Sequence, residues 1–150
     1  GDVAIVGNIG AGQTGGGVDV INVIDLTGTP RTIAHVTAGP TVESVSISPD
    51  GRYVAAMVMN GSNSPKASPL YNDYSLLKVY ALASRGLTPI TEARIGHWCQ
   101  GVAWNRDART VLVQCMVEKE IQVFAFDGRA LTPRPALHMS GGPAGIRTLP

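Results

Sequence analysis

The sequence lacks most of the features that mark a membrane protein or a nucleic-acid-binding protein. No apolar run approaches the roughly 20 residues needed to cross a bilayer. No basic segment precedes an apolar stretch in the manner of a signal peptide. The net charge is only +1, and Lys and Arg are scattered along the chain, which gives no basis for a nucleic-acid surface. We therefore expect neither a membrane nor a nucleic acid as a partner.

Cysteine and histidine are also scarce. The two cysteines are too few for a disulfide framework or for a zinc site, which takes about four ligands at close spacing. Of the three histidines, only His97 lies where a hairpin is expected to begin. We therefore expect no metal cluster and no cofactor. The sequence does not identify the cellular compartment, and a periplasmic or secreted location is favoured over a cytoplasmic one.

Glycine and proline, in contrast, are abundant. The 150 residues include 18 glycines and 10 prolines, between short runs of Val, Ile and Thr. This composition is typical of many short strands joined by turns. Hydrophobic residues make up 44% of the chain, which is enough to bury a core and argues against disorder. We expect an all-β fold.

A repeat organises these strands. The segments VSISPDGRYVAAM (45–57) and VAWNRDARTVLVQC (102–115) each read as a strand, a polar turn and a second strand. A further strand recurs as INVIDLTG, LKVYALAS and IQVFAFDG. Four strands in a unit of about 45 residues are typical of a propeller blade. We assign a partial first blade to 1–38, a second blade to 39–95, a third to 96–140 and the start of another to 141–150.

These repeats resemble a known family. The runs VESVSISPDGRYVAAMV and LLKVYALASRGLTP, and then GHWCQGVAWNRDARTVLVQC and IQVFAFDGRALTP, look like the lactonase-like, YVTN-type seven-bladed β-propellers, which include bacterial 6-phosphogluconolactonase-like proteins. The resemblance implies about three four-stranded antiparallel blades, fewer than a closed ring needs. The expected partners are therefore the remaining blades, from the same parent chain or from further copies in a homo-oligomer.

The resemblance also implies a ligand face where the chain enters each innermost strand. The segments GPTVES, GHWCQG and GGPAGIRT would present Glu43, His97, Trp98, Gln100 and Arg147 toward a shared centre. His97 or Glu43 could activate water and Arg147 could stabilise an oxyanion, while Trp98 and Gln100 would bind the ligand. The alternative is that His97 and Trp98 cap the core and Arg147 is solvated.

We accordingly expect a binding or scaffold module for a small, sugar-like ligand. The alternative is a hydrolase acting on a sugar lactone such as a phosphogluconolactone. The binding interpretation is favoured because no acid–base pair stands out in the sequence.

The two cysteines are a candidate disulfide. If the hairpin folds around 106–108, then Trp104 faces Thr110, and the same register sets Cys99 opposite Cys115. Directly opposed residues in an antiparallel pair are close enough for a bridge. A register slip of one residue would break this opposition, leaving two buried thiols as the alternative.

Three other segments have two interpretations. VAIVGNIGAGQTGGG (3–17) contains G-x-G-x-x-G from Gly10 to Gly15, but no helix is expected after it. We interpret it as the loop between the third and fourth strands of a blade rather than a dinucleotide site. SPLYNDYSLLKVYALASRG (68–86) has helical spacing, yet its alignment with the other repeats favours a strand. Its residues Tyr71, Asn72, Asp73 and Tyr74 are a further surface candidate, for a partner or a sugar, unless the insertion is simply a mobile loop.

Overall fold

The computed structural model describes residues 1–10 and 17–148 of the chain. In this part of the chain the secondary structure is entirely β, and the prediction of an all-β fold is confirmed. The strands are β1 (Val3–Gly7), β2 (Asp19–Asp25), β3 (Arg31–Gly39), β4 (Val42–Ile47), β5 (Tyr53–Val58), β6 (Ser75–Ala83), β7 (Gly86–Ile95), β8 (Cys99–Trp104), β9 (Thr110–Cys115), β10 (Glu120–Phe126) and β11 (Leu131–His138).

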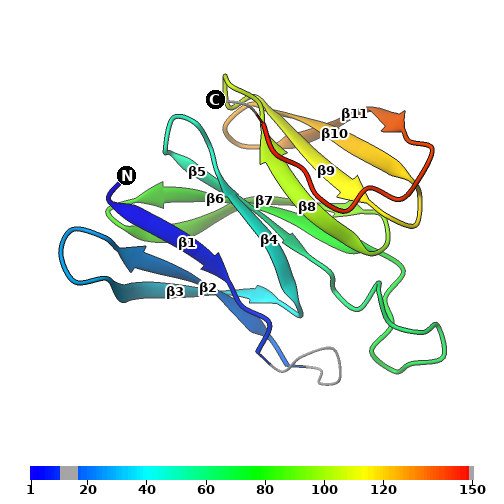
Figure 1. The fold of residues 1–150 in the computed structure, drawn as a ribbon, viewed down its shortest axis with the longest axis horizontal. Helices are drawn as coiled ribbons and strands as arrows, with labels where there is room; N and C mark the ends of the chain where they lie inside the picture. Colours follow the sequence, from blue (N-terminus) through cyan, green and yellow to red (C-terminus); the bar gives the residue numbers. More distant parts are fainter. Residues whose placement is uncertain (11–16, 149–150) are drawn as a thin grey trace.

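The strands form three antiparallel sheets. Strands β4 to β7 and β8 to β11 form two four-stranded sheets in sequence order, and β1 to β3 form a three-stranded sheet. Figure 1 shows the three sheets side by side in the order of the chain, with β4 next to both β1 and β8. This is a propeller-like arrangement. Within the described residues of 141–148, no strand is present.

The first sheet corresponds to the last three strands of the other two. Its β1–β2 pair matches β5–β6, and its β2–β3 pair matches β6–β7. The glycine-rich segment therefore connects the second and third strands of this repeat, and its assignment between the third and fourth strands was wrong. Residues 11–16, which carry most of the G-x-G-x-x-G string, lie outside the described residues.

The segment 75–83 is a strand because its apolar residues alternate between two buried faces. Leu77 and Val79 of β6 pack in the core between the second and third sheets, whereas Tyr80 packs in the core between the first and second. The neighbouring β5 does the same: Ala55 and Met57 face one side, and the side chains beside them face the other. A sheet that is covered on both faces needs such nearly continuous apolar strands. The helical alternative for 68–86 is wrong for β6.

An aromatic group fixes the second sheet against the third. Trp104 on β8 and Phe126 on β10 have ring centroids 5.6 Å apart, and Tyr53 on β5 stands edge-on to Phe126 at 5.0 Å. The buried indole of Trp104 donates from Nε1 to the carbonyl of Ser46 at 3.0 Å. A tryptophan with its N–H satisfied is well suited to such a buried position between sheets.

The connections lie at two opposite ends of the sheets. One end, which we call the hairpin end, carries the turns 48–52, 105–109 and 127–130. The other end, which we call the link end, carries the insertion 59–74, the sheet-to-sheet link 96–98 and the turn 116–119. Side chains from different sheets can therefore meet at either end, although they are distant in the sequence.

The cysteines lie opposite each other, but through a different register from the one expected. Trp104 pairs with Val111 rather than with Thr110, so the predicted register was wrong by one residue. A β-bulge between Cys99 and Gly101 shifts the pairing back, and Cys99 stands opposite Cys115. The two sulfurs form a disulfide of 2.07 Å. The extra residue of this bulge is Gln100.

The bridge gives a direct prediction. Alkylation of the unfolded protein without reductant should leave its mass unchanged, whereas alkylation after reduction should add two adducts. Replacing both cysteines by Ala should cost about 3 kcal/mol of unfolding free energy, the value for a loop of about 15 residues. Two adducts without reductant would contradict the bridge.

Candidate functional site

His97 and Trp98 lie in the link between the second and third sheets, and hydrogen bonds from other segments fix their backbone. Trp98 has a φ of 46°, and the residue that matches it in the preceding link, Thr41, has a φ of 62°. In both links a side chain accepts the amide hydrogen: Ser62 Oγ lies 3.0 Å from the Trp98 nitrogen, and Asp19 Oδ2 lies 2.8 Å from the Thr41 nitrogen. These contacts hold the strained links in one conformation.

The ring of His97 lies between two carboxylates from different loops. Its Nδ1 is 2.6 Å from Oε1 of Glu118 in the β9–β10 turn. Its Nε2 is 2.8 Å from Oδ1 of Asp73 in the β5–β6 insertion. Glu118 also accepts the backbone amide of His97, at 2.9 and 3.0 Å. We call His97, Asp73 and Glu118 the histidine clasp.

Tyr71 extends the histidine clasp into the insertion. Its hydroxyl donates to Asp73 Oδ1 at 2.8 Å, and its ring stacks on the imidazole with a centroid separation of 6.5 Å. Asn72 Nδ2 donates to the carbonyl of Asn60 at 2.8 Å, which closes the insertion on itself. The structure thus brings together two sequence candidates that were considered separately, His97 and the 71–74 segment.

The close approach of the Glu118 carboxylate to the link 96–98 depends on Gly96. A Cβ on Gly96 would overlap the Glu118 carboxylate. Because glycine has no Cβ, the carboxylate can lie flat against the link and reach both the amide and the ring of His97.

The electrostatics of the histidine clasp favour a charged imidazolium. Hydrogen bonds to Glu118 and then to Asp73 raise the pKa of His97 above its usual 6.5. The hydrogen bond from His97, followed by that from Tyr71, lowers the pKa of Asp73 below its usual 3.8. In the protonated ring both nitrogens are donors and both are used, so neither can accept a proton from water.

The other predicted site residues lie around the histidine clasp but do not join it. Glu43 is the extra residue of a bulge in β4, at the place that Gln100 takes in β8. Trp98 is 41% exposed, at the link end. Arg147 lines a small cavity of about 230 Å³ beside β4 and β8. Within residues 1–10 and 17–148, no side-chain hydrogen bond or ion pair joins any two of the predicted residues Glu43, His97, Trp98, Gln100 and Arg147.

Sequence reasoning missed Glu118 altogether. The signal that could have found it is the repeat itself: the turn 116–119 and the insertion 59–74 both join the second and third strands of a sheet. Both therefore lie at the end where His97 begins the next sheet. Their polar side chains are the ones that can reach the imidazole.

The carboxylates of the histidine clasp stand at opposite nitrogens of one ring and do not converge on a point. Over the residues that the structure describes, no group of three or more His, Cys, Asp or Glu side chains is placed to hold a metal ion. The same part of the chain contains no helix that is long and apolar enough to span a membrane.

The fold resembles that of several solved structures, although the sequence alone finds no relative. No protein-family model matches the sequence, and no curated protein matches it. A "putative 6-phosphogluconolactonase" from Bacteroides fragilis superposes with a TM-score of 0.64 at 22% identity, over 87% of this chain and 35% of that one. The chain shares its fold. Hydrazine synthase from Kuenenia stuttgartiensis gives a TM-score of 0.65 at 12% identity, over 95% of this chain and 48% of that one.

A eukaryotic initiation factor also superposes, with a TM-score of 0.55 at 12% identity, over 82% of this chain and 27% of that one. The chain thus spans less than half the length of each of these three structures. Their differing names indicate that the shared fold does not fix the chemistry.

The histidine clasp predicts a pH dependence with a definite sign. Because the pKa of His97 is raised above 6.5 in the folded protein, its stabilisation is complete below that pH and is lost as the pH rises through the raised pKa. Nuclear magnetic resonance titration of the imidazole should show the midpoint falling more in Glu118→Gln than in Asp73→Asn. An unchanged midpoint in both variants would contradict the histidine clasp.

The glycine gives a second test. Gly96→Ala should displace the Glu118 carboxylate and destabilise the protein by about 1–3 kcal/mol, the range for a lost charged hydrogen bond. In a Glu118→Ala background the same substitution should cost much less, because the overlapping group is gone. Equal costs in both backgrounds, measured by denaturant unfolding, would show that the alanine strains the backbone instead.

Proposed function

We propose that this chain is the ligand-binding part of a lactonase-like, YVTN-type propeller, and that its link end takes a small, sugar-like molecule without hydrolysing it. The observation that carries the proposal is the state of His97. Both of its ring nitrogens are held by carboxylates, which suits a residue that builds a surface rather than one that exchanges protons.

Lactone hydrolysis needs a base with a free lone pair and a cation near the developing oxyanion. His97 has no free lone pair while it is protonated. Arg147 lies in a cavity formed with residues of β4 and β8, such as Ser46 and Ala103, and that cavity does not include His97. A group of separated residues of this kind supports binding better than catalysis.

Binding is supported by what the histidine clasp exposes. Asp73 has a side chain that is 80% exposed, so its carboxylate can accept further hydrogen bonds from hydroxyl groups. Trp98, the next residue after His97, offers an exposed aromatic face at the same end. An aromatic face beside a carboxylate suits a polyhydroxylated ring, which has apolar faces and hydroxyl edges.

The partners and the compartment belong to the same proposal. The similar structures are two to three times longer than this chain, which supports a ring completed by further blades of the parent chain or of other copies. The Cys99–Cys115 bridge supports a periplasmic or secreted location, because structural disulfides persist in oxidising compartments.

A sugar-lactone hydrolase is the second candidate, and the name of the Bacteroides fragilis protein favours it. The two candidates differ in what His97 must do. For hydrolysis the imidazole would have to release a carboxylate and deprotonate water. For binding, the imidazole keeps the contacts with Glu118 and Asp73 that the structure shows.

The test uses D-gluconate and δ-gluconolactone as probes. Binding should quench the fluorescence of Trp98, with the buried Trp104 as an internal reference. Because Trp98→Ala removes this reporter, its affinity is measured by calorimetry, and it should be about tenfold weaker, as expected for the loss of a contact worth about 1.4 kcal/mol.

The same samples decide about hydrolysis. In a pH-stat assay we expect no acceleration of lactone opening over the spontaneous rate. Acceleration that disappears in both His97→Ala and Glu43→Ala would overturn the binding proposal in favour of the hydrolase. No quenching by either probe would exclude both the sugar acid and its lactone as ligands.

A further inference from the structure

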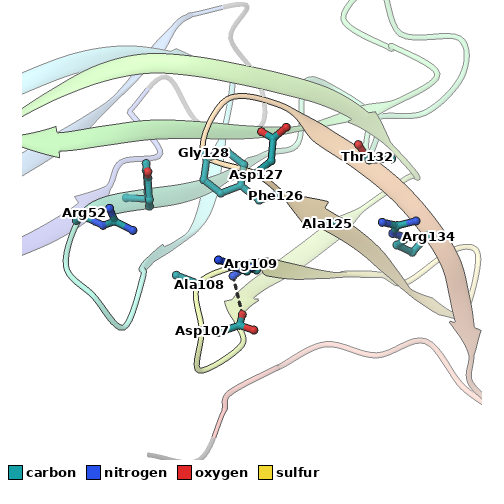
Figure 2. A pocket seen from close by; sticks show the side chains of 11 residues that line it. Arg52, Asp107, Ala108, Arg109, Ala125, Phe126, Asp127, Gly128, Thr132 and Arg134 are labelled. Atoms are coloured by element: carbon teal, nitrogen blue, oxygen red, sulfur yellow. Dashed lines mark hydrogen bonds between the residues drawn. The ribbon is translucent and has the colours of Figure 1, made fainter.

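A cavity of about 670 Å³ opens at the hairpin end, where the second and third sheets meet. Figure 2 shows three arginines around it: Arg52 from the β4–β5 turn, Arg109 from the β8–β9 turn and Arg134 from β11. Tyr53, which is partly buried, and Phe126, which is almost wholly buried, also belong to the lining. This volume lies within the range of sites that bind small molecules.

The structure positions these arginines in different ways. Arg52 is already paired, with its Nε 2.7 Å from Asp50 Oδ2. Among residues 1–10 and 17–148, neither Arg109 nor Arg134 forms an ion pair with a carboxylate. The backbone of Arg109 is nevertheless fixed, because its carbonyl accepts the Phe126 amide at 2.8 Å. Two guanidinium groups without an acidic partner are thus held at one opening.

The lining carboxylates are mainly occupied by their own turns. Asp107 Oδ1 accepts the amide of Arg109 at 2.8 Å, and Asp127 Oδ1 accepts the amides of Arg129 and Ala130, each at 2.8 Å. These backbone hydrogen bonds lower the pKa of Asp127, so its charge persists. Because Asp50 already pairs with Arg52, Arg109 and Arg134 stand against Asp107 and Asp127, and the lining carries no large excess of either charge.

We propose that this cavity binds a small organic acid, with one carboxylate or phosphate group between Arg109 and Arg134 and an apolar body against Tyr53 and Phe126. Guanidinium groups bind such oxyanions through paired hydrogen bonds. The lack of a large positive excess, together with the aromatic side chain of Tyr53 in the lining, favours a singly or doubly charged acid with an apolar part over a polyanion. The site lies at the opposite end from the histidine clasp, so it does not depend on the function proposed there.

The ligand class is tested with four probes by calorimetry on the unmodified chain. Benzoate and phenyl phosphate should both bind saturably, and the tighter of the two identifies the preferred oxyanion. Phenol, which lacks the oxyanion, should bind at least about tenfold more weakly, and tripolyphosphate should bind no more tightly than phenyl phosphate. Absence of saturable binding by both aromatic acids would overturn the proposal, and so would tighter binding of the polyanion.

The site itself is tested with variants. Arg109→Ala and Arg134→Ala should each weaken the tighter acid about tenfold or more, as expected for a lost hydrogen bond to a charged group. Arg129→Ala is the matched control, because Arg129 carries the same charge in the adjacent turn and is not part of the lining. Equal weakening in the control would mean that only net charge matters, and would overturn the site. Amide shifts on the unmodified chain should change at 107–109 and 126–134, and shifts confined to the link end would also refute it.

Discussion

No sheet in this chain can bury both of its faces alone, and this constraint governs the rest of the structure. The middle sheet shows it most clearly, because β5 and β6 send alternate side chains into two separate cores. Apolar burial contributes about 25 cal/mol per Å², so each sheet is stable through its neighbours. The stacking of sheets, and not any single turn, therefore sets the position of every residue discussed above.

Stacking also explains why functional groups gather at the two ends. The second and third sheets each contribute turns to the hairpin end and connections to the link end, and the insertion 59–74 is the longest of these connections. At the link end, the insertion of the second sheet and the turn of the third both reach the link between them, and His97 lies at their meeting point. At the hairpin end, turns of the second and third sheets lie around a cavity lined by arginines. One rule of assembly thus produces two chemically different surfaces.

The sequence predicted the strands and sheets well because their signal is local. Alternating apolar residues and a repeated turn are sufficient to place β4–β5 and β8–β9. The register was less secure. The expected Trp104–Thr110 pair was wrong because the turn closes on Asn105 and Thr110, and a bulge at Gln100, on one strand only, then brings Cys99 back opposite Cys115. A bulge changes the count between two strands without changing the apolar pattern of either, so the pattern alone could not reveal it. The predicted register holds only on the Cys99 side of the bulge, and there Cys99 and Cys115 are opposed as expected.

The histidine clasp was not predicted, and the reason is different. His97 was weighed as an isolated residue because its partners lie 21 and 24 positions away in the sequence. What makes them neighbours is the equivalence of two loops in successive sheets, together with a glycine that leaves room for a carboxylate. Neither Gly96 nor Glu118 is unusual alone, and their relation exists only when the third sheet is folded against the second. The raised pKa of His97 is therefore a consequence of tertiary packing. That same packing places a carboxylate against each nitrogen of the ring, including the one that its predicted role as a base would use.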